Sequence, residues 1–457
     1  MEQQQKQNRF SNWLKTSITA RMLTIGLIVL LLLIPLGFIK DLITEREFRQ
    51  TDVVNEINSK WGNEILLYGP ILKVPYKTYN ETSVYNKRTK QSTVRKETVI
   101  NHAYFFPKTL DFNTQVDSKK KKRNNFESVV YTADIAVKGS FSKPDFSSKS
   151  IPKKDIIWDK ATLVIQTTNL KGIKSEVNIT FNQTQYAFET NFKNTETRYN
   201  NSLDELESSF IKKENLNFKN DVPFNFNLAY NGSKSIQFIP IGKSTTAAMT
   251  SNWTNPSFTG NFLPQNEGNK VTKNGFKANW KVMHINRSFS QQFFKKLPNL
   301  SAFAFGTKLI VPIDEYQKST RSAKYGFMVI GLTFLIFFLI QTLSKISIHS
   351  FQYVMIGIAL IMFYTLLISI SEHSSFLKAY LIAGASVIVL ITLYSKSILK
   401  NYKFPLLIGS SLTLLYSFIF VIIQLENYAL LVGSIGLFII LAVVMYVSRK
   451  IDWETNA

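Results

Sequence analysis

The sequence contains no cysteine. This absence excludes a disulfide framework, a thiolate nucleophile and a metal site built on cysteine. Histidine is almost as scarce, and no two histidines have the spacing of a shared helical metal site. The four histidines of the chain are His102, His284, His349 and His373. We therefore expect no metal and no other cofactor.

Charge is almost missing from two parts of the chain, residues 22–39 and the long stretch from residue 326 onward. The first part is a run of about 18 apolar residues, which is the lower end of a membrane-spanning length. Five more apolar runs of spanning length follow it in the second part. They cover residues 326–343, 352–371, 376–394, 404–423 and 428–448. The pattern indicates an integral membrane protein, so the mean hydropathy of −0.01 is an average over two solvents.

The first apolar run is preceded by Arg9, Lys15 and Arg21, as the apolar core of a signal peptide would be. The residues after it, 40–43, contain no small-x-small cleavage site. We therefore predict an uncleaved transmembrane anchor at 22–39, with residues 1–21 in the cytoplasm.

Positive charge in the loops between the apolar runs predicts the topology. If the anchor exits outward, every second loop faces the cytoplasm, and these loops carry the lysines and arginines. They are Lys345, Lys396, Lys400, Lys403, Arg449 and Lys450. The outer loops carry Glu372 and Glu426, with Lys378 as a mild exception. Both termini are thus expected in the cytoplasm, with residues 449–457 as a cytoplasmic tail.

Ionisable residues are missing near the centres of the spans, which argues against a proton-driven pump. Polar side chains lie near the span ends instead, where Gln341, Gln352, Glu372 and His373 are candidate functional residues. The glycines within the spans are typical of close helix packing.

Residues 40–325 have a different pattern. Apolar residues at helical spacing predict a juxtamembrane helix to about Ser59, ended by Gly62, and alternation then predicts β-strands at 128–137, 161–165 and 223–228. The turn dipeptides are Gly69-Pro70, Asn231-Gly232 and Asn274-Gly275, and a short helical patch is expected at 202–212. The predicted fold class is a membrane protein of the α+β class. It has six transmembrane helices, one N-terminal anchor plus a C-terminal bundle of five (326–448), and a large antiparallel β-rich periplasmic domain, which we expect to consist of two packed sheets.

Two basic motifs favour ordinary structure over nucleotide or nucleic-acid binding. Gly242-Lys243-Ser244-Thr245 resembles the end of a phosphate-binding loop, but Gln237 stands where the motif requires glycine, so we expect a β-turn. The run 119–123 (Lys-Lys-Lys-Lys-Arg) is best explained by a solvated hairpin tip, with lipid phosphates or acidic polymers as the alternative contacts. The net charge of +23 fits anionic lipid headgroups in a membrane protein, so we expect membrane lipids as partners and no nucleic acid.

A cluster of aromatic residues with one arginine is the candidate interaction surface. Rings stack on apolar surfaces and arginine grips anions, so such a cluster can bind sugar or lipid. A packed sheet core with the arginine at its edge is the competing interpretation. The cluster consists of Trp253, Pro256, Phe258, Phe276, Trp280 and Arg287.

Several ordered motifs resemble the CreD family of inner-membrane proteins, which are described as cell-envelope integrity proteins. They begin with Trp61-Gly62 and the segment 69–75, and continue through 251–260, 274–280 and 284–287. Further matches are 321–325, 349–353, 363–364, 371–373, 428–431 and Asp452-Trp453. The resemblance covers nearly the whole chain and implies a location and a role in the envelope, without a mechanism.

The sequence therefore predicts a bacterial inner-membrane protein, not demonstrably an enzyme, that supports cell envelope integrity. Its partners beyond lipid would be envelope glycan or another envelope protein. Two alternatives stay open. One is a transporter or a lipid- or glycan-handling membrane protein, and the other is a periplasmic carbohydrate-active enzyme on a membrane anchor, whose carboxylate pair the sequence does not locate.

Overall fold

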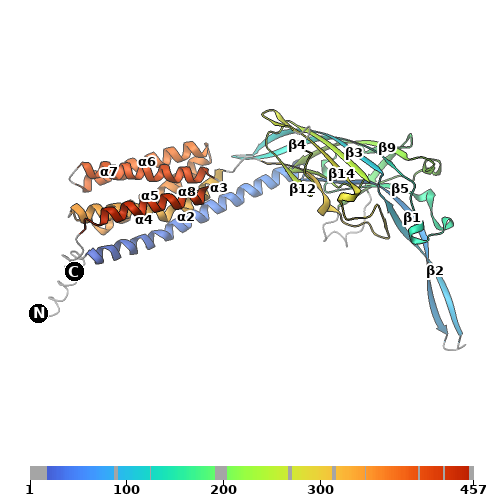
Figure 1. The fold of residues 1–457 in the computed structure, drawn as a ribbon, viewed down its shortest axis with the longest axis horizontal. Helices are drawn as coiled ribbons and strands as arrows, with labels where there is room; N and C mark the ends of the chain where they lie inside the picture. The colour runs from blue at the N-terminus through green and yellow to red at the C-terminus, as the bar shows by residue number, and fades with distance from the viewer. Residues whose placement is uncertain are drawn as a thin grey trace. The chain divides into compact units, whose positions relative to one another are not determined.

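The computed structural model divides the chain into two compact units, residues 1–52 with 313–457, and residues 53–312 (Figure 1). Each is described by itself. The described residues are 18–86, 91–123, 125–190, 203–265, 270–310, 315–344, 346–399, 402–425 and 428–451.

Within those residues, six helices are long and apolar enough to cross a membrane, as the sequence predicted. A short helix, α3 (Glu315–Lys324), precedes the second of them. The six are α2 (Ile18–Trp61), α4 (Gly326–Ser344), α5 (Ser350–Ser371), α6 (Phe376–Ile398), α7 (Lys403–Gln424) and α8 (Ala429–Ser448). Their apolar surface is continuous because lipid replaces water as the solvent of a spanning helix.

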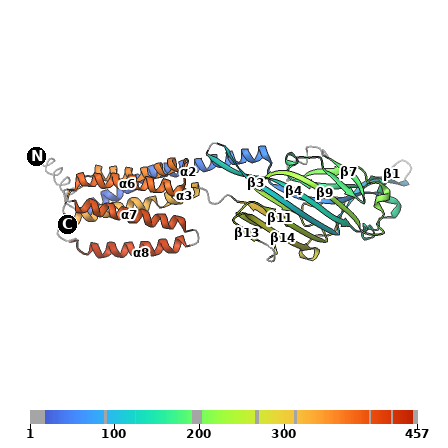
Figure 2. The ribbon, with the colours of Figure 1, turned by 90° about the horizontal axis from the view of Figure 1, so that it is seen from above.

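Small residues set the helix contacts in the unit of residues 1–52 and 313–457. A Cβ atom on Gly326 would lie 2.8 Å from Leu36 Cδ1, and one on Gly357 would lie 2.1 Å from Leu32 Cδ1. The N-terminal span α2 is therefore packed closely against α4 and α5. Helix α8 lies beside α7 at the edge of the unit, and none of its side chains is buried (Figure 2).

The predicted anchor and juxtamembrane helix form one helix, α2, which ends at Trp61, two residues after the predicted end at Ser59 and directly before Gly62. Gly62 follows with a φ of 156°, and a Cβ atom there would lie 2.1 Å from the carbonyl oxygen of Asn231. Only glycine allows the chain to leave the helix this close to a neighbouring strand.

Sixteen strands are described in residues 53–312 (Figure 1). They are β1 (Ile65–Asn86), β2 (Gln91–Phe105), β3 (Thr109–Arg123), β4 (Phe126–Phe141), β5 (Thr162–Thr167), β6 (Asn178–Phe181), β7 (Thr184–Thr190), β8 (Asp204–Ser208), β9 (Val222–Ser233), β10 (Ser235–Phe238), β11 (Ser244–Ser251), β12 (Pro256–Gly260), β13 (Lys270–Thr272), β14 (Gly275–Met283), β15 (Gln292–Phe294) and β16 (Phe305–Leu309).

The strands form one sheet that curls into a near-barrel. Its order is β12-β16-β10-β1-β5-β8-β7-β6-β9-β4-β3-β11-β14-β13, with β2 pairing both β1 and β15. The antiparallel β-rich domain is thus confirmed, although β1/β10 and β3/β11 are parallel pairs. Strand β7 pairs with β6 and with β8, and so joins what was expected to be two separate sheets.

The inward faces of the strands form a single apolar core. In β3 and β9 every second side chain is buried, including Phe112, Phe224 and Phe226. The rings of Phe112 and Phe238 stack at 4.4 Å. Alternation along a strand puts one set of side chains inside and leaves the other set on the outer face.

Three local predictions within this unit need correction. The helical patch at 202–212 is wrong where it is described, because residues 204–208 form strand β8, in which Leu206 is buried between two glutamates that lie on the other face. Gly69-Pro70 and Asn231-Gly232 lie within β1 and β9 rather than in turns. The first marks a shift of strand register, which accommodates a proline that has no N–H to donate. Asn274-Gly275 does connect two strands, β13 and β14.

Candidate functional site

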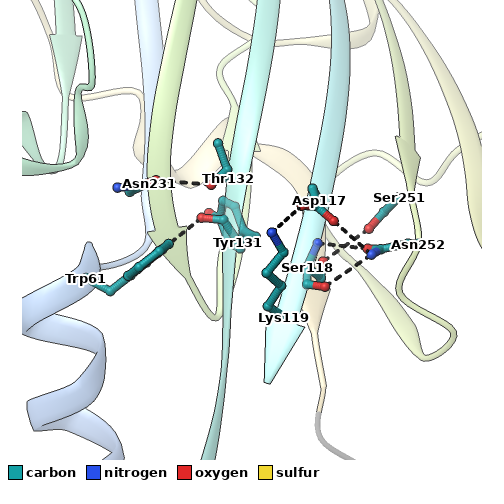
Figure 3. Close-up of polar contacts among 9 residues, drawn as sticks. All are labelled: Trp61, Asp117, Ser118, Lys119, Tyr131, Thr132, Asn231, Ser251 and Asn252. Atoms are coloured by element: carbon teal, nitrogen blue, oxygen red, sulfur yellow. Dashed lines mark hydrogen bonds and ion pairs between the residues drawn. The ribbon is translucent and has the colours of Figure 1, made fainter. Parts of the chain in front are cut away.

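The last turn of α2 is fixed to the sheet by Trp61. Its indole Nε1 donates to the carbonyl oxygen of Tyr131 at 3.0 Å (Figure 3). The ammonium of Lys121 lies 4.7 Å from the ring centroid of Trp61, within cation–π distance. One turn earlier, the hydroxyl of Ser128 donates to the side-chain oxygen of Asn58 at 2.6 Å. The hairpin of β3 and β4 thus holds the end of the helix.

Ion pairs account for most of the basic run 119–123. Arg123 lies 2.5 Å and Lys60 2.6 Å from the Glu56 carboxylate. The hydrogen bonds from Arg123, and then those from Lys60, lower the pKa of Glu56 from 4.5 to about 2. Lys119 pairs with Asp117, while Lys120 and Lys122 both pair with Glu127. The run is a hairpin end, as expected, and four of its cations have carboxylate partners.

The polar groups behind this hairpin are paired as well. The hydroxyl of Tyr131 donates to the carbonyl oxygen of Ser235 at 2.6 Å, and burial raises the pKa of Tyr131 well above its ordinary value. Asn252 accepts from the Ser118 amide at 2.8 Å and donates to Asp117 at 3.0 Å (Figure 3). The contacts in this region are structural and connect α2, β3, β4 and β11.

Arg287 lies inside the β-rich domain, with 6% of its surface exposed. Its guanidinium donates to the carbonyl oxygens of Ile241 (3.0 Å), Gly242 (3.2 Å) and Phe289 (3.1 Å), and also to Gln291. Burial lowers its pKa from 12.5 to about 10. A planar fork with five donors suits such a set of carbonyls, so Arg287 joins two loops.

The aromatic residues of the candidate surface are mostly core residues. Trp253, Phe276 and Trp280 are buried, while Phe258 and Pro256 are half-buried in or at the start of β12. Phe258 packs edge-on against Phe276 and Trp280, each at 5.9 Å. With Arg287 also inside, these side chains do not form an exposed binding face. The sequence could not separate the two interpretations, because aromatic residues are frequent in both.

The polar residues at the span ends make local contacts. Tyr353 donates to Gln341 at 2.8 Å, in a buried pair between α4 and α5. The side chain of Gln352 accepts from the backbone N–H of His349 at 2.9 Å and so caps α5. Glu372 lies 3.6 Å from Arg46, and His373 is exposed. The structure does not bring these four residues together in one site.

The phosphate-loop-like segment is a sheet connection. The backbone N–H groups of Lys243 and Ser244 donate to the carbonyl oxygens of Pro107 and Lys108, each at 3.0 Å. A phosphate-binding loop needs such N–H groups free for the ligand. The segment is therefore an ordinary connection leading into β11 and not a phosphate-binding loop. Among the described residues, no group of three or more histidine or carboxylate side chains could hold a metal ion.

Two carboxylates that the sequence did not single out lie side by side on β8. Glu207 accepts from Lys73 and from Thr162, both at 2.6 Å, and Glu205 accepts from Gln166 at 2.9 Å. Burial, and then these two carboxylates, raise the pKa of Tyr104 to about 12. Because each carboxylate has fixed partners on β1 or β5, the pair has a structural role in joining these strands. The Glu-Leu-Glu alternation was the sequence signal that could have located it.

A model of a known family, described as inner membrane protein CreD, matches residues 17–454. The inner membrane protein CreD of Escherichia coli (strain K12) is 28% identical over 447 residues, which cover 96% of this chain and 94% of the relative. A solved structure of a candidate nutrient binding protein from Legionella pneumophila matches 50% of this chain and 77% of its own, at 9% identity and a TM-score of 0.22. So low a TM-score carries no argument.

The family match extends over both units of the structure, from the N-terminal span α2 to the end of α8. It agrees with the six apolar helices and with the β-rich domain inserted between the first and second of them. The chain therefore belongs to the family of the inner membrane protein CreD.

Proposed function

We propose that this protein spans the inner membrane with both termini in the cytoplasm and residues 53–312 in the periplasm, where it supports cell envelope integrity. The observation that carries the proposal is the distribution of charge at the ends of the described helices. Lys396 follows the apolar part of α6, and Arg449 follows α8, whereas Glu372 follows α5. Basic residues gather on the cytoplasmic side of membrane proteins.

The composition of the domain agrees with an aqueous compartment outside the cytoplasm. The exposed positions of β3 in its sheet are polar, and the sequence has no cysteine that an oxidising compartment would cross-link. A sheet domain attached at both ends to membrane helices is held near the membrane and is well suited to contact envelope components. The supporting role itself comes from the family resemblance.

The absence of cysteine makes the topology directly testable by single cysteine substitutions. Lys149→Cys lies at an exposed position in the β-rich domain, and Lys396→Cys at an exposed position at the end of α6. A membrane-impermeant maleimide is expected to label Lys149→Cys in intact spheroplasts, and Lys396→Cys only after permeabilisation. Labelling of both positions in intact spheroplasts, or the reverse pattern, would contradict the topology.

The role in the envelope is tested in cells. Deleting the gene should make the cells more sensitive to detergents and bile salts, because an impaired envelope admits them. The full chain should restore resistance, and a chain in which a flexible linker replaces residues 65–309 should not, although it remains in the membrane. Unchanged sensitivity of the deletion strain would refute the proposed role.

A further inference from the structure

The outer face of the sheet has a depression of about 310 Å³ across β9, β4 and β3. Its lining comes from three strands and from the segment that precedes β6. The polar side chains in it are Asn113, Gln115, Asp134, Ser175 and Asn227, and apolar residues, Ala136 among them, form the rest.

Strand register creates this depression. Asn227 on β9 is paired with Ala136 on β4, which is in turn paired with Asn113 on β3. Directly paired residues point to the same face of a sheet, so the small alanine leaves space between two amides. The row continues with Ala248 on β11 and Asn279 on β14, in the same alternation of alanine and asparagine.

These residue types oppose the strand propensity of the sequence. Asparagine and aspartate are depleted in strands, whereas threonine and valine are favoured on a pleated surface. Here Asn227, Asn113 and Asp134 occupy interior positions of strands in the middle of the sheet order. Positions where the local preference is violated without a structural gain are where function is expected.

In the rows on either side of the depression, polar side chains are paired with one another. On one side, Asp111 accepts from Thr246 at 2.5 Å and lies 3.5 Å from Lys138. On the other side, Thr132 donates to Asn231 at 3.1 Å, and the row ends in the Asp117–Asn252 bond (Figure 3).

Between these rows, the lining side chains make no side-chain hydrogen bond to any part of the chain that the structure describes. They are Asn113, Gln115, Asp134, Ser175 and Asn227. Several donors and acceptors on rigid strands therefore converge on one space while remaining available to a ligand.

We propose that this depression binds a neutral saccharide. Amide side chains offer donors and acceptors together, and the aspartate and serine add further oxygen atoms, which matches a ligand rich in hydroxyl groups. No lysine or arginine is among the described lining residues, which disfavours an anion. A single carboxylate is too few for a calcium site. The volume is at the lower end of ligand pockets and suits one or two sugar rings.

The source of the saccharide, an envelope glycan, rests on the proposed periplasmic location, whereas the site itself does not. Binding to the purified chain is independent of topology. If maleimide labelling fails while saccharide binds, the topology is wrong and the site stands. If labelling succeeds and no saccharide binds, the site is wrong and the topology stands.

The test uses the full chain, purified in a detergent without a sugar headgroup. The probes are two neutral tetrasaccharides, one of N-acetylglucosamine and one of glucose, and one anionic tetrasaccharide of galacturonic acid. Saturation-transfer NMR and calorimetry should detect at least one neutral probe and should not detect the anionic one. Binding of neither neutral probe, or equal binding of the anionic probe, would overturn the proposal.

Variants locate the binding. Ala136→Leu fills the floor of the depression and should abolish binding, while Ala187→Leu makes the same change at an exposed position on β7 and should leave it unchanged. Asn113→Ala and Asn227→Ala should each weaken binding about three- to tenfold, as expected for the loss of a hydrogen bond. Thermal unfolding checks that each variant is folded. If Ala136→Leu does not fold, the two asparagine variants decide, and wild-type affinity in both would overturn the site.

Discussion

The large apolar side chains of the two units point in opposite directions. In the β-rich domain large apolar side chains point inward, as Phe112 and Phe226 do. In the helical unit many of them point outward, so that Leu430 is 86% and Phe438 72% exposed. In water this surface would be unfavourable, whereas lipid tails are as apolar as leucine itself. Burial of apolar surface therefore drives folding of the β-rich domain, while contact geometry decides the packing of the helices.

The two units also differ in the kind of close contact that packs their side chains. The β-rich domain is filled by interlocking rings, such as Trp280 and Phe305 at 5.7 Å. The helices approach at glycines, as Gly357 does against Leu32 and Gly436 against Phe418. The first unit should thus be most sensitive to loss of volume, and the second to added volume.

The largest effect is expected from truncation in the β-rich core. Trp280→Ala should lower the free energy of unfolding by about 3–5 kcal/mol, because it leaves a cavity among aromatic neighbours. Trp280→Phe is the matched control and should lose less than about 1.5 kcal/mol. The indole nitrogen has no hydrogen-bond partner among the described residues, so the control loses volume alone. Denaturant unfolding in detergent, followed by far-UV circular dichroism, measures both losses. Equal small losses would mean that the ring is not a core residue.

Removing a buried donor is expected to have the next largest effect. Arg287→Ala removes the guanidinium donor from three carbonyl oxygens, of which that of Ile241 keeps only Gln291 as a donor, and should lower the free energy of unfolding by about 2–3 kcal/mol. The stability of Arg287→Lys should lie between those of the wild type and Arg287→Ala, because an ammonium cannot reach all the acceptors that the guanidinium fork reaches. The same unfolding measurement and the cellular abundance of the protein test this. A variant that keeps wild-type stability and abundance but loses envelope support would restore Arg287 as an interaction residue.

Added volume should disturb the helical unit. Gly357→Val forces a side chain onto Leu32 and should lower stability by about 1–2 kcal/mol. Gly331→Val is the matched control, since a Cβ atom at Gly331 has no atom within 4 Å, and its effect should stay within about 0.5 kcal/mol. Thermal unfolding of the two variants in one detergent gives the difference. Equal stability would mean that glycine contacts do not set the packing of α2 against α5.

The smallest effect concerns pH at the end of α2. The pKa of Glu56 is about 2 in the folded protein and 4.5 ordinarily, so its ion pairs stabilise the fold above pH 4.5 and are lost as pH falls toward 2. The melting temperature of the wild type should therefore fall more steeply over this window than that of Glu56→Gln. High salt should reduce the difference, because the pair is exposed. Glu45→Gln, an exposed change on the same helix, should leave the wild-type slope. Identical slopes for wild type and Glu56→Gln would exclude the ion pair as the cause.

The sequence alone determined the six spans and the end of α2. A spanning helix satisfies its backbone hydrogen bonds within itself, so length and apolarity decide it locally. The end of the helix at Gly62 could be predicted for the same reason, because it too depends on local sequence. The β-rich class was also readable, since alternation along a strand reports which side chains face inward.

Only the tertiary structure decided which strands are neighbours. Strands β3 and β11 are paired although more than a hundred residues separate them, and no local pattern encodes that pairing. Pairing placed Asn113, Ala136 and Asn227 in one row, and it put carbonyl oxygens from two loops around Arg287. The aromatic cluster was visible in the sequence, but its burial depended on β12, β14 and β16 coming together. The backbone donors and acceptors of a strand are alike at every position, so they do not specify which strand pairs with which, or in what register. The register of distant strands, and any site built across them, is therefore fixed only by the tertiary structure.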